Sequence, residues 1–312
     1  MNNSILVLGG SGFVGRHVVE QLVARGFRVV VPTRRVDKAR TLQVLPTINL
    51  VAADVRRADV LARLVGGSAV VINLVGILNE TRAATFRNAH VDFARAVTSA
   101  CQATGVRRLI HMSALNADPA GPSQYLRSKG EAEAIVTASG LDWTVFRPSV
   151  IFGREDQFLN LFATLLRYVP VVALASPDAR FQPVFVDDVA HCIVEALRLP
   201  ATIGRIYPLC GPNVYTLRQL VRYAGAVTGK SRPIIGLGSA LGTLQASVLE
   251  HLPGKLLTRD NLASMRKDST CDGESVAAFG IVPQTLESVV PSYLGPDAFK
   301  SRYDSLRVTG AR

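Results

Sequence analysis

The chain has 312 residues, of which 48% are hydrophobic and 19% charged, a composition typical of a folded globular protein. The formal net charge is +11, and residues 1–150 carry 18 Lys and Arg against 10 Asp and Glu. Aromatic residues make up only 6% of the chain and the cations are scattered, which argues against a nucleic-acid-binding protein and favours a small anionic ligand in the N-terminal half.

The cysteines and the hydrophobic stretches bear on the compartment. Cysteines stand at positions 101, 192, 210 and 271 without a Cys-x-x-Cys pair. This spacing argues against a metal site or a disulfide framework and indicates a reducing compartment. A strand is predicted almost directly after Met1, which leaves no room for an export signal. Residues 233–249 are uncharged but interrupted by polar residues, so they predict one buried or surface-lying helix and no transmembrane span. We expect a cytoplasmic protein, with peripheral attachment to the inner face of the membrane as the alternative.

A glycine-rich turn follows the first predicted strand, residues 4–8, and precedes a helix predicted over residues 13–24. Gly9, Gly12 and Gly15 have Gly-x-x-Gly-x-x-Gly spacing, with Gly10 as an extra glycine. Such glycines permit a tight turn, a close approach of the backbone to a pyrophosphate and close packing of the helix on the strand. The helix start also presents N–H groups to the phosphates. The turn therefore predicts a dinucleotide site, although similar glycine patterns also occur in ordinary turns.

The second predicted strand, residues 27–31, bears on the choice of cofactor. Sites that prefer NAD place an acidic residue about 20 positions after the glycines. This chain has Arg34 and Arg35 there, and two guanidinium groups suit the 2′-phosphate of NADP(H). The alternative is a solvated basic turn with Asp37 as a local partner. Asp54, after a third strand at residues 50–53, either faces the adenine end of the cofactor or caps the next helix.

Strands and helices continue to alternate through the first half of the chain. Further strands are predicted at residues 68–74, 107–112 and 142–146, and a helix at residues 86–104. Repeated strand–helix units with apolar strands predict an α/β fold, a doubly wound parallel sheet with helices on both faces. Asn73–Gly76 would then lie at the carboxyl end of a strand, where such sheets bind ligands.

Tyr125 and Lys129 begin a helical segment and lie four residues apart, so they share one helix face. A neighbouring ammonium stabilises a phenolate, and we therefore expect Lys129 to lower the pKa of Tyr125 and make its hydroxyl a general acid/base. Ser113, just beyond the fifth strand, could hydrogen-bond a substrate oxygen. This spacing is also common on helices without a catalytic role.

The second half of the chain has a looser pattern. We expect helices over residues 158–168 and 216–225, and a late strand at residues 205–209. Asp187 and Asp188 precede a helix that extends to residue 198, and we expect them to cap it. The predicted division is a nucleotide-binding domain at residues 1–153, to which residues 181–215 return, and a smaller lobe at residues 154–180 and 216–312. No fold is predicted for the end of the segment 259–312.

The glycine turn, Asn73–Gly76, Ser113, the Tyr125/Lys129 pair and Arg147-Pro148-Ser149 together resemble the short-chain dehydrogenase/reductase superfamily, in its extended or atypical branch. The resemblance covers roughly residues 4–215. Residues 107–153 most resemble bacterial relatives of the Rossmann-fold accessory subunit of respiratory complex I. A slide of one residue would put Ala114 in place of Ser113 at the family's serine position.

The resemblance implies bound NADP(H), with the Tyr as proton donor or acceptor, the Lys on the nicotinamide ribose and the Ser on the substrate oxygen. The residues expected to contact the cofactor are Gly9, Gly10, Ser11, Gly12, Phe13, Val14, Gly15, Arg34, Arg35, Asp54, Val55, Asn73, Leu74, Val75, Gly76, Met112, Lys129, Pro148 and Ser149.

Two classes of function remain open at this point. The first is an NADP(H)-dependent oxidoreductase or epimerase/dehydratase-like enzyme acting on a carbonyl or alcohol substrate, which the Tyr/Lys pair favours. The second is a nucleotide-binding accessory or assembly protein of a membrane respiratory complex, with residues 158–175 and 233–249 as interaction surfaces. The apolar second half favours this class.

Overall fold

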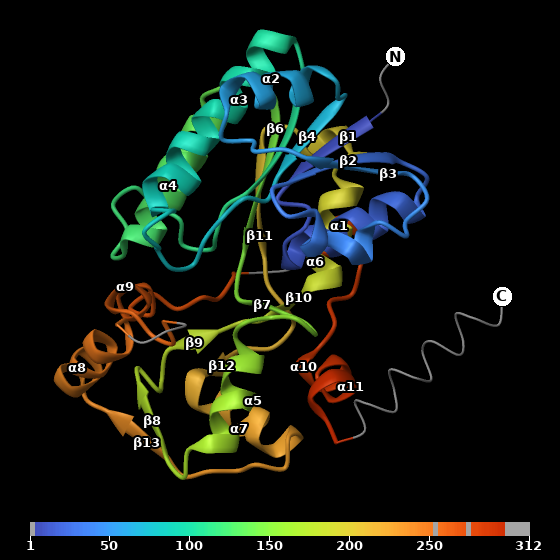
Figure 1. Ribbon diagram of the computed structural model, residues 1–312. Coiled ribbons are helices and arrows are strands. Elements are labelled where there is room, and N and C mark those ends of the chain that lie inside the picture. Colours follow the sequence, from blue (N-terminus) through green and yellow to red (C-terminus); the bar gives the residue numbers. More distant parts are fainter. Residues whose placement is uncertain (1–3, 252–254, 273–275, 297–312) are drawn as a thin grey trace, which may run out of the picture. The chain divides into compact units, whose positions relative to one another are not determined.

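The computed structural model describes residues 4–251, 255–272 and 276–296 (Figure 1). The chain forms two units. Unit 1 comprises Met1–Pro148, Val186–Leu209 and Ser275–Ile281, and unit 2 comprises Ser149–Phe185, Cys210–Glu274 and Val282–Arg312. The boundary after the first segment thus lies at residue 148 and not 153, and the chain returns at residue 186 and not 181. The third short segment of unit 1 was not expected from the sequence.

Unit 1 is built on a seven-stranded parallel sheet with the strand order β11-β6-β5-β4-β1-β2-β3. Its strands are β1 (Ser4–Leu8), β2 (Arg28–Thr33), β3 (Ile48–Ala52), β4 (Val70–Asn73), β5 (Arg108–Met112), β6 (Asp142–Pro148) and β11 (Arg205–Leu209). The strand order reverses direction between β1 and β4, which is where sheets of this kind bind ligands. In the register of the sheet Leu8 lies opposite Asn73, so the carboxyl ends of β1 and β4 are adjacent.

Helices cover both faces of this sheet (Figure 1). On one face α1 (Phe13–Ala24) packs against α6 (Val186–Glu195). On the other lie α2 (Ala58–Gly66), α3 (Phe93–Thr104) and α4 (Gln124–Thr137), whose buried side chains form one core with β4 and β5. The doubly wound α/β fold predicted from the sequence is therefore confirmed. A π-helical segment, η2 (Arg87–Asp92), precedes α3 where the sequence predicts uninterrupted α-helix.

Asp187 and Asp188 lie in the first turn of α6, and Asp187 has a different role from the expected one. Asp187 pairs through its carboxylate with Nδ1 of His17 on α1, and its peptide oxygen accepts a hydrogen bond of 2.9 Å from the Gln21 side chain. Asp188 is buried. The expectation that Asp187 caps α6 is therefore wrong, because its carboxylate joins two helices instead.

Unit 2 has its own core. The core is formed by α5 (Leu159–Tyr168), α7 (Leu217–Val227) and short strand pairs, with Leu159, Leu166, Leu220 and Val221 fully buried. The pairs are β7 (Ile151–Phe152) with β10 (Val184–Phe185), β8 (Val172–Ala175) with β13 (Ile234–Leu237), and β9 (Arg180–Phe181) with β12 (Tyr215–Thr216). The shorter elements of unit 2 are α9 (Arg259–Ser264), α10 (Leu286–Val289) and α11 (Pro291–Leu294), and those of unit 1 are η1 (Val36–Leu42), η3 (Pro200–Thr202) and η4 (Ala277–Phe279). The last part of the segment left without a predicted fold, residues 297–312, lies outside the described residues.

A disulfide joins Cys210 to Cys271 within unit 2, with a Cα–Cα distance of 6.1 Å. The same two segments are bridged by the Gln182 amide, which donates to the Gly211 carbonyl oxygen and accepts from the Cys271 N–H. The expectation of no disulfide is wrong, because pairs 61 residues apart leave no local spacing signal. The cysteine spacing therefore no longer supports the expected reducing compartment. The other two cysteines, Cys101 and Cys192, are free and buried.

Residues 233–249 form a strand and a helix, not the single helix expected. Strand β13 is followed by α8 (Ser239–Leu249), which turns its small residues Gly242 and Ala246 inward. Its larger side chains Leu241, Leu244 and Val248 are 57–61% exposed, so the outward face of α8 is apolar. Among the described residues, no helix combines the length and the hydropathy needed to cross a membrane.

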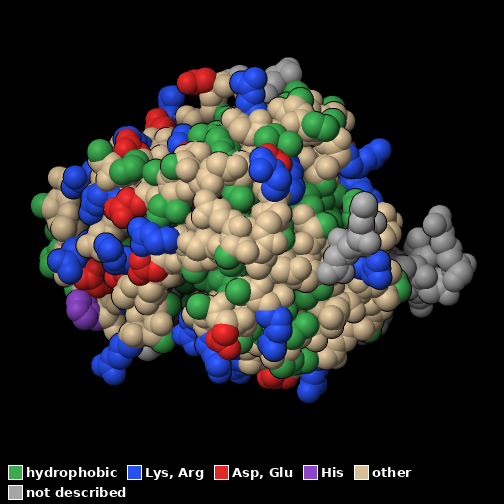
Figure 2. Space-filling model, turned by 90° about the horizontal axis from the view of Figure 1, so that it is seen from above, with side chains coloured by type: hydrophobic (Ala, Val, Ile, Leu, Met, Phe, Trp, Pro, Cys, Tyr) green, Lys and Arg blue, Asp and Glu red, His purple; other side chains and the backbone are tan. Residues whose placement is uncertain are grey.

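The surface of the molecule carries charges of both signs. Figure 2 shows Lys and Arg interspersed with Asp and Glu on the face seen from above, and no single basic patch there.

Candidate nucleotide-binding and catalytic site

The glycine turn after β1 has room for glycine only. Gly9 has a φ of +82°, a left-handed conformation that side-chain-bearing residues rarely adopt. A Cβ at Gly15 would lie 2.2 Å from the Gly9 carbonyl oxygen and 2.6 Å from the Gly10 Cα atom. These are backbone atoms, which cannot rotate away. The first turn of α1 is therefore in direct contact with the loop before it, as the sequence motif requires.

The N-terminus of α1 suits an anion. Gly12 is the N-cap residue and has no side chain to cover the helix end, and its N–H donates to the Gly9 carbonyl oxygen at 2.9 Å. The N–H groups of the first turn have no acceptors within a helix, and no acidic residue lies in this turn. A pyrophosphate at this position would accept hydrogen bonds from Phe13, Val14 and Gly15 and lie at the positive end of the helix dipole.

The loop after β4 lies directly against the glycine turn. A Cβ at Gly9 would be 3.1 Å from the Leu74 carbonyl carbon and 3.2 Å from the Val75 nitrogen, and the Leu74 N–H donates to the Leu8 carbonyl oxygen at 2.9 Å. The Asn73 side chain is buried. The structure therefore brings together the two backbone segments that the sequence assigns to the cofactor.

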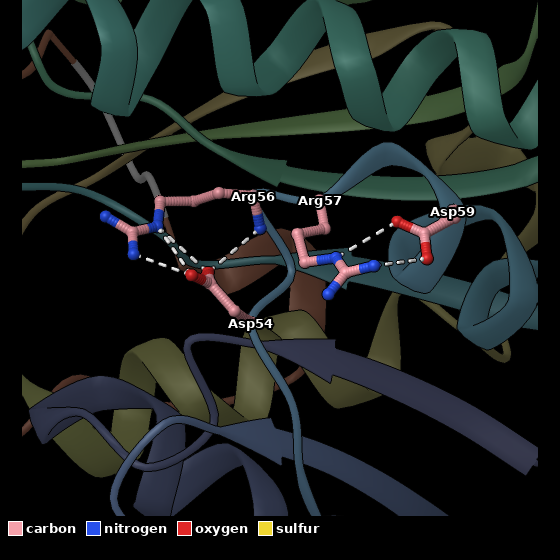
Figure 3. A network of polar contacts seen from close by, with 4 residues as sticks. All are labelled: Asp54, Arg56, Arg57 and Asp59. Carbon is pink, nitrogen blue, oxygen red and sulfur yellow. Dashed lines mark hydrogen bonds and ion pairs between the residues drawn. The ribbon is translucent and has the colours of Figure 1, made fainter.

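At the far end of this site, Arg34 and Arg35 follow β2 and are exposed. Asp54 is held by Arg56 through hydrogen bonds of 2.6–3.2 Å, beside a second pair formed by Arg57 and Asp59 (Figure 3). The Arg56 hydrogen bonds, with a smaller contribution from the charge of Arg34, lower the pKa of Asp54 to about 2. Asp54 does not cap α2, whose N-cap residue is Arg57. The following Val55 packs against the core.

Helix α4 carries Tyr125 and Lys129, and its start is fixed by Ser123, whose side chain accepts a hydrogen bond from the Leu126 N–H. The half-buried ring of Tyr125 lies edge-on to Phe86 and to His90, with centroid distances of 5.8 Å. Lys129 is 6% exposed and its Nζ donates to the Met112 carbonyl oxygen at 3.1 Å.

The Lys129 ammonium also lies beside the β4 loop. A Cβ at Gly76 would be 3.1 Å from Nζ of Lys129. Helix α4 therefore contacts the β4 loop through Lys129. In the resemblance to the superfamily, this lysine is the side chain expected on the nicotinamide ribose.

Burial shifts the pKa values of this pair. It raises the pKa of Tyr125 to about 12 and lowers the pKa of Lys129 to about 8. The expectation that Lys129 lowers the pKa of the phenol is wrong for this structure, because loss of solvent around Tyr125 dominates. Tyr125 is therefore a neutral hydroxyl at pH 7.

Ser113 and Ala114 are both buried at the end of β5. The Oγ atom of Ser113 is buried and has no hydrogen-bond partner among the residues that the structure describes. A buried hydroxyl without a partner is unusual in folded proteins, and a ligand oxygen would supply one.

Pro148 and Ser149 lie at the boundary between the units. Pro148 ends β6, and its carbonyl oxygen accepts a hydrogen bond from the Leu115 N–H in unit 1. Ser149 belongs to unit 2, where its hydroxyl hydrogen-bonds the Ser269 carbonyl oxygen at 2.8 Å.

The sequence did not indicate two buried histidines at this site, His90 on η2 and His111 on β5. His90 hydrogen-bonds the Ile77 N–H of the β4 loop, and His111 contacts the side chain of Asn73. One signal was available for His111, which lies two residues before Ser113 in an extended stretch, where alternate residues point to the same side.

Comparisons with known proteins identify the family of the chain. Residues 9–200 match the model of a family described as NAD(P)H-binding. The chain is 38% identical over 231 residues, 72% of its length, to the mitochondrial NADH dehydrogenase [ubiquinone] 1 alpha subcomplex subunit 9 of Mus musculus, of which it spans only 61%. It is 30% identical to a ceramide reductase of Caulobacter vibrioides, covering 78% of this chain and 76% of that protein.

Among solved structures, an NADPH-dependent quinone oxidoreductase from Escherichia coli in complex with NADPH has the same fold. The TM-score is 0.76 at 22% identity, over 93% of this chain and 99% of that one. The glycine turn, the parallel sheet and the family match lead to one conclusion: the chain belongs to the NAD(P)H-binding family of Rossmann-fold proteins.

Proposed function

We propose that this protein is an NADP(H)-dependent reductase of a small carbonyl compound. The observation that carries the proposal is the placement of α4, which sets the buried ammonium of Lys129 against the β4 loop, one helical turn from Tyr125. The first turn of α1 would hold the pyrophosphate, the β4 loop and Lys129 the nicotinamide ribose, and Arg34 and Arg35 the 2′-phosphate. When bound, the cofactor supplies the hydride.

The side chains of the site would handle the proton. Tyr125, neutral because burial raises its pKa to about 12, donates its phenolic proton to the carbonyl oxygen as that oxygen becomes negative. Ser113 donates a hydrogen bond to the same oxygen. The products are an alcohol and the oxidised nucleotide, and the phenolate recovers its proton from water. The raised phenol pKa keeps phenolate, the base that alcohol oxidation needs, scarce at neutral pH.

The Tyr125→Phe variant tests the chemistry. We expect it to bind NADPH with unchanged affinity and to lose at least ~100-fold in carbonyl-dependent NADPH oxidation, the usual contribution of a general acid. The relatives' names suggest the compounds to assay: a ceramide and a quinone. An azo dye is added because an NAD(P)H azoreductase is 25% identical over 72% of this chain. Tyr168→Phe is the matched control, since that side chain is 82% exposed and lies in unit 2. Undiminished turnover by Tyr125→Phe would remove Tyr125 from the mechanism.

The choice of nucleotide has its own test. The double variant Arg34→Ala/Arg35→Ala should weaken NADPH binding by at least ~10-fold, the loss of one or two charge-assisted hydrogen bonds, and leave NADH binding nearly unchanged. Calorimetric titration measures both affinities. Arg40→Ala, another exposed arginine nearby in the chain, serves as the control. If the native protein binds NADH and NADPH equally well, the argument from the arginines fails.

A second candidate function rests on the apolar outward face of α8. Leu241, Leu244 and Val248 repeat at helical spacing and are more than half exposed, as in a surface that another protein or a membrane covers. Several relatives are named as subunits of mitochondrial NADH dehydrogenase. In this function the protein binds the nucleotide for structure alone. NADPH binding without oxidation by any carbonyl, quinone or azo compound would favour this role.

A further inference from the structure

We propose that His90 and His111 are positioning residues that hold the β4 loop, Leu74–Ile77, in the shape that binds the cofactor. Both act as neutral hydrogen-bond acceptors, His90 directly at one end of the loop and His111 through Asn73 at the other. The inference rests on the proposed function only in that this loop contacts the nucleotide.

The hydrogen bonds of His90 fix its tautomer. Its Nε2 atom accepts the Ile77 N–H at 3.1 Å. A backbone N–H can only donate, so Nε2 carries no proton and the ring proton is on Nδ1. Nδ1 lies 2.8 Å from the Ser128 Oγ, to which it donates, and that hydroxyl donates in turn to the Tyr125 carbonyl oxygen at 2.8 Å. His90 thus connects the end of the loop to the helix that carries Tyr125 and Lys129.

The hydrogen bonds of Asn73 assign the other tautomer to His111. The Asn73 Oδ1 accepts the Val75 N–H at 3.2 Å, which fixes the orientation of the amide. Its Nδ2 therefore donates to the His111 Nδ1 at 3.2 Å, which places the His111 proton on Nε2, a buried atom without a hydrogen-bond partner among the described residues. His111 therefore holds the rotamer of Asn73, and Asn73 in turn holds the start of the β4 loop through the Val75 N–H.

Both rings are kept neutral by their surroundings. Burial, together with the nearby charge of Lys129, lowers the pKa of His90 to about 3 and that of His111 to about 3. An imidazolium has no acceptor nitrogen, so a protonated ring at either position would release the loop. The same ammonium that the proposed mechanism uses therefore also protects the acceptor state of the two histidines.

The π-helical segment η2 explains how His90 reaches the loop. His90 lies within Arg87–Asp92, where the wider helical turn changes the direction of the side chains relative to α3. Such segments are rare and occur frequently at functional sites. Its ring also stacks on Phe86, with 5.7 Å between centroids, which fixes the ring plane.

The experiment has two independent readouts. Nitrogen-15 NMR of the native protein without nucleotide reports the tautomers, and we expect the proton on Nδ1 of His90 and on Nε2 of His111. The NADPH dissociation constant is then measured for His90→Leu, which lacks an acceptor, and for His90→Gln, whose Oε1 can accept the Ile77 N–H. We expect His90→Leu to raise the dissociation constant at least ~10-fold and His90→Gln to stay within ~3-fold of the native value.

Several results would overturn the proposal. A proton on Nε2 of His90 would show that it does not accept from Ile77. Equal losses of affinity in His90→Leu and His90→Gln, or equal affinity with only a lower melting temperature, would reduce His90 to a packing residue. A native protein that has the expected tautomers but binds no nucleotide contradicts the proposed function instead. In that case, faster exchange of the Ile77 amide proton in His90→Leu than in His90→Gln would still show that His90 holds the β4 loop. Equal exchange rates in the two variants would refute this role.

Discussion

Substitution of Lys129 by methionine is expected to abolish most carbonyl reduction and, at neutral pH, to stabilise the protein without nucleotide. Lys129 is 6% exposed, and burial lowers its pKa from 10.5 to about 8. Below pH 8 the ammonium is charged in both the folded and the unfolded chain, so the folded state bears the full desolvation cost. Methionine fills a similar volume without that cost.

The sign of the pH dependence follows from this shift. Between pH 8 and pH 10.5 the folded native protein loses the Lys129 proton while the unfolded chain keeps it, so the free energy of unfolding of the native protein rises with pH. The stability advantage of Lys129→Met should therefore be greatest below pH 8, at most about 3 kcal/mol, and should shrink towards pH 10.5. Denaturant unfolding at several pH values measures it.

The exposed Lys230 provides the control, since Lys230→Met removes the same charge without relieving a buried one. A Lys129→Met variant that is less stable than the native protein at pH 7 would show that the hydrogen bond from Nζ to the Met112 carbonyl oxygen outweighs the desolvation cost. Loss of turnover together with gained stability would identify Lys129 as a residue kept for function at the expense of stability.

The Gly15→Ala variant should lose nucleotide binding and unfold more easily. The added Cβ would lie 2.2 Å from the Gly9 carbonyl oxygen, so α1 must move away from the turn that presents its N–H groups to the phosphates. We expect a loss of about 1–3 kcal/mol in the free energy of unfolding, typical of forced overpacking, and no detectable NADPH binding. Thermal unfolding with and without NADPH reports both effects, since a bound ligand raises the melting temperature.

Alanine substitutions at two other glycines should have smaller effects than Gly15→Ala. A Cβ at Gly12 would lie 3.2 Å from the Gly9 carbonyl oxygen, and a Cβ at Gly67 no closer than 3.5 Å to its neighbours. The order of damage should be Gly15→Ala, then Gly12→Ala, with Gly67→Ala close to the native protein. Native-like NADPH protection in Gly15→Ala would contradict the assignment of the phosphate site to this turn.

The sequence was sufficient to predict the parallel sheet and the glycine turn that leads into α1. Apolar strands such as Ser4–Leu8 and glycines such as Gly15 carry local signals, because their roles depend on neighbours a few residues away. The pKa of Tyr125 was predicted in the wrong direction, because spacing along a helix reveals a neighbouring charge but not the loss of solvent.

Other features depend on contacts distant in the sequence. The Cys210–Cys271 disulfide and the pairing of Asp187 with His17 join segments 61 and 170 residues apart. The segment 233–249 is uncharged and mostly apolar, and periodicity alone does not divide it into β13 and α8. The roles of His90 and His111 follow from hydrogen-bond directions that only the three-dimensional arrangement defines.

The interrupted course of unit 1 has a consequence for synthesis on the ribosome. Val18, Val19 and Leu22 of α1 are buried, and α1 packs against α6, which is translated only after Ser149–Phe185 of unit 2. When residues 1–148 have been synthesised, α1 therefore still lacks its contact with α6, and β6 lacks its neighbour β11. Both contacts can form only after some sixty further residues have emerged. During this interval the growing chain is open to chaperones and to misassembly, and a fragment ending at Pro148 would remain in that state permanently.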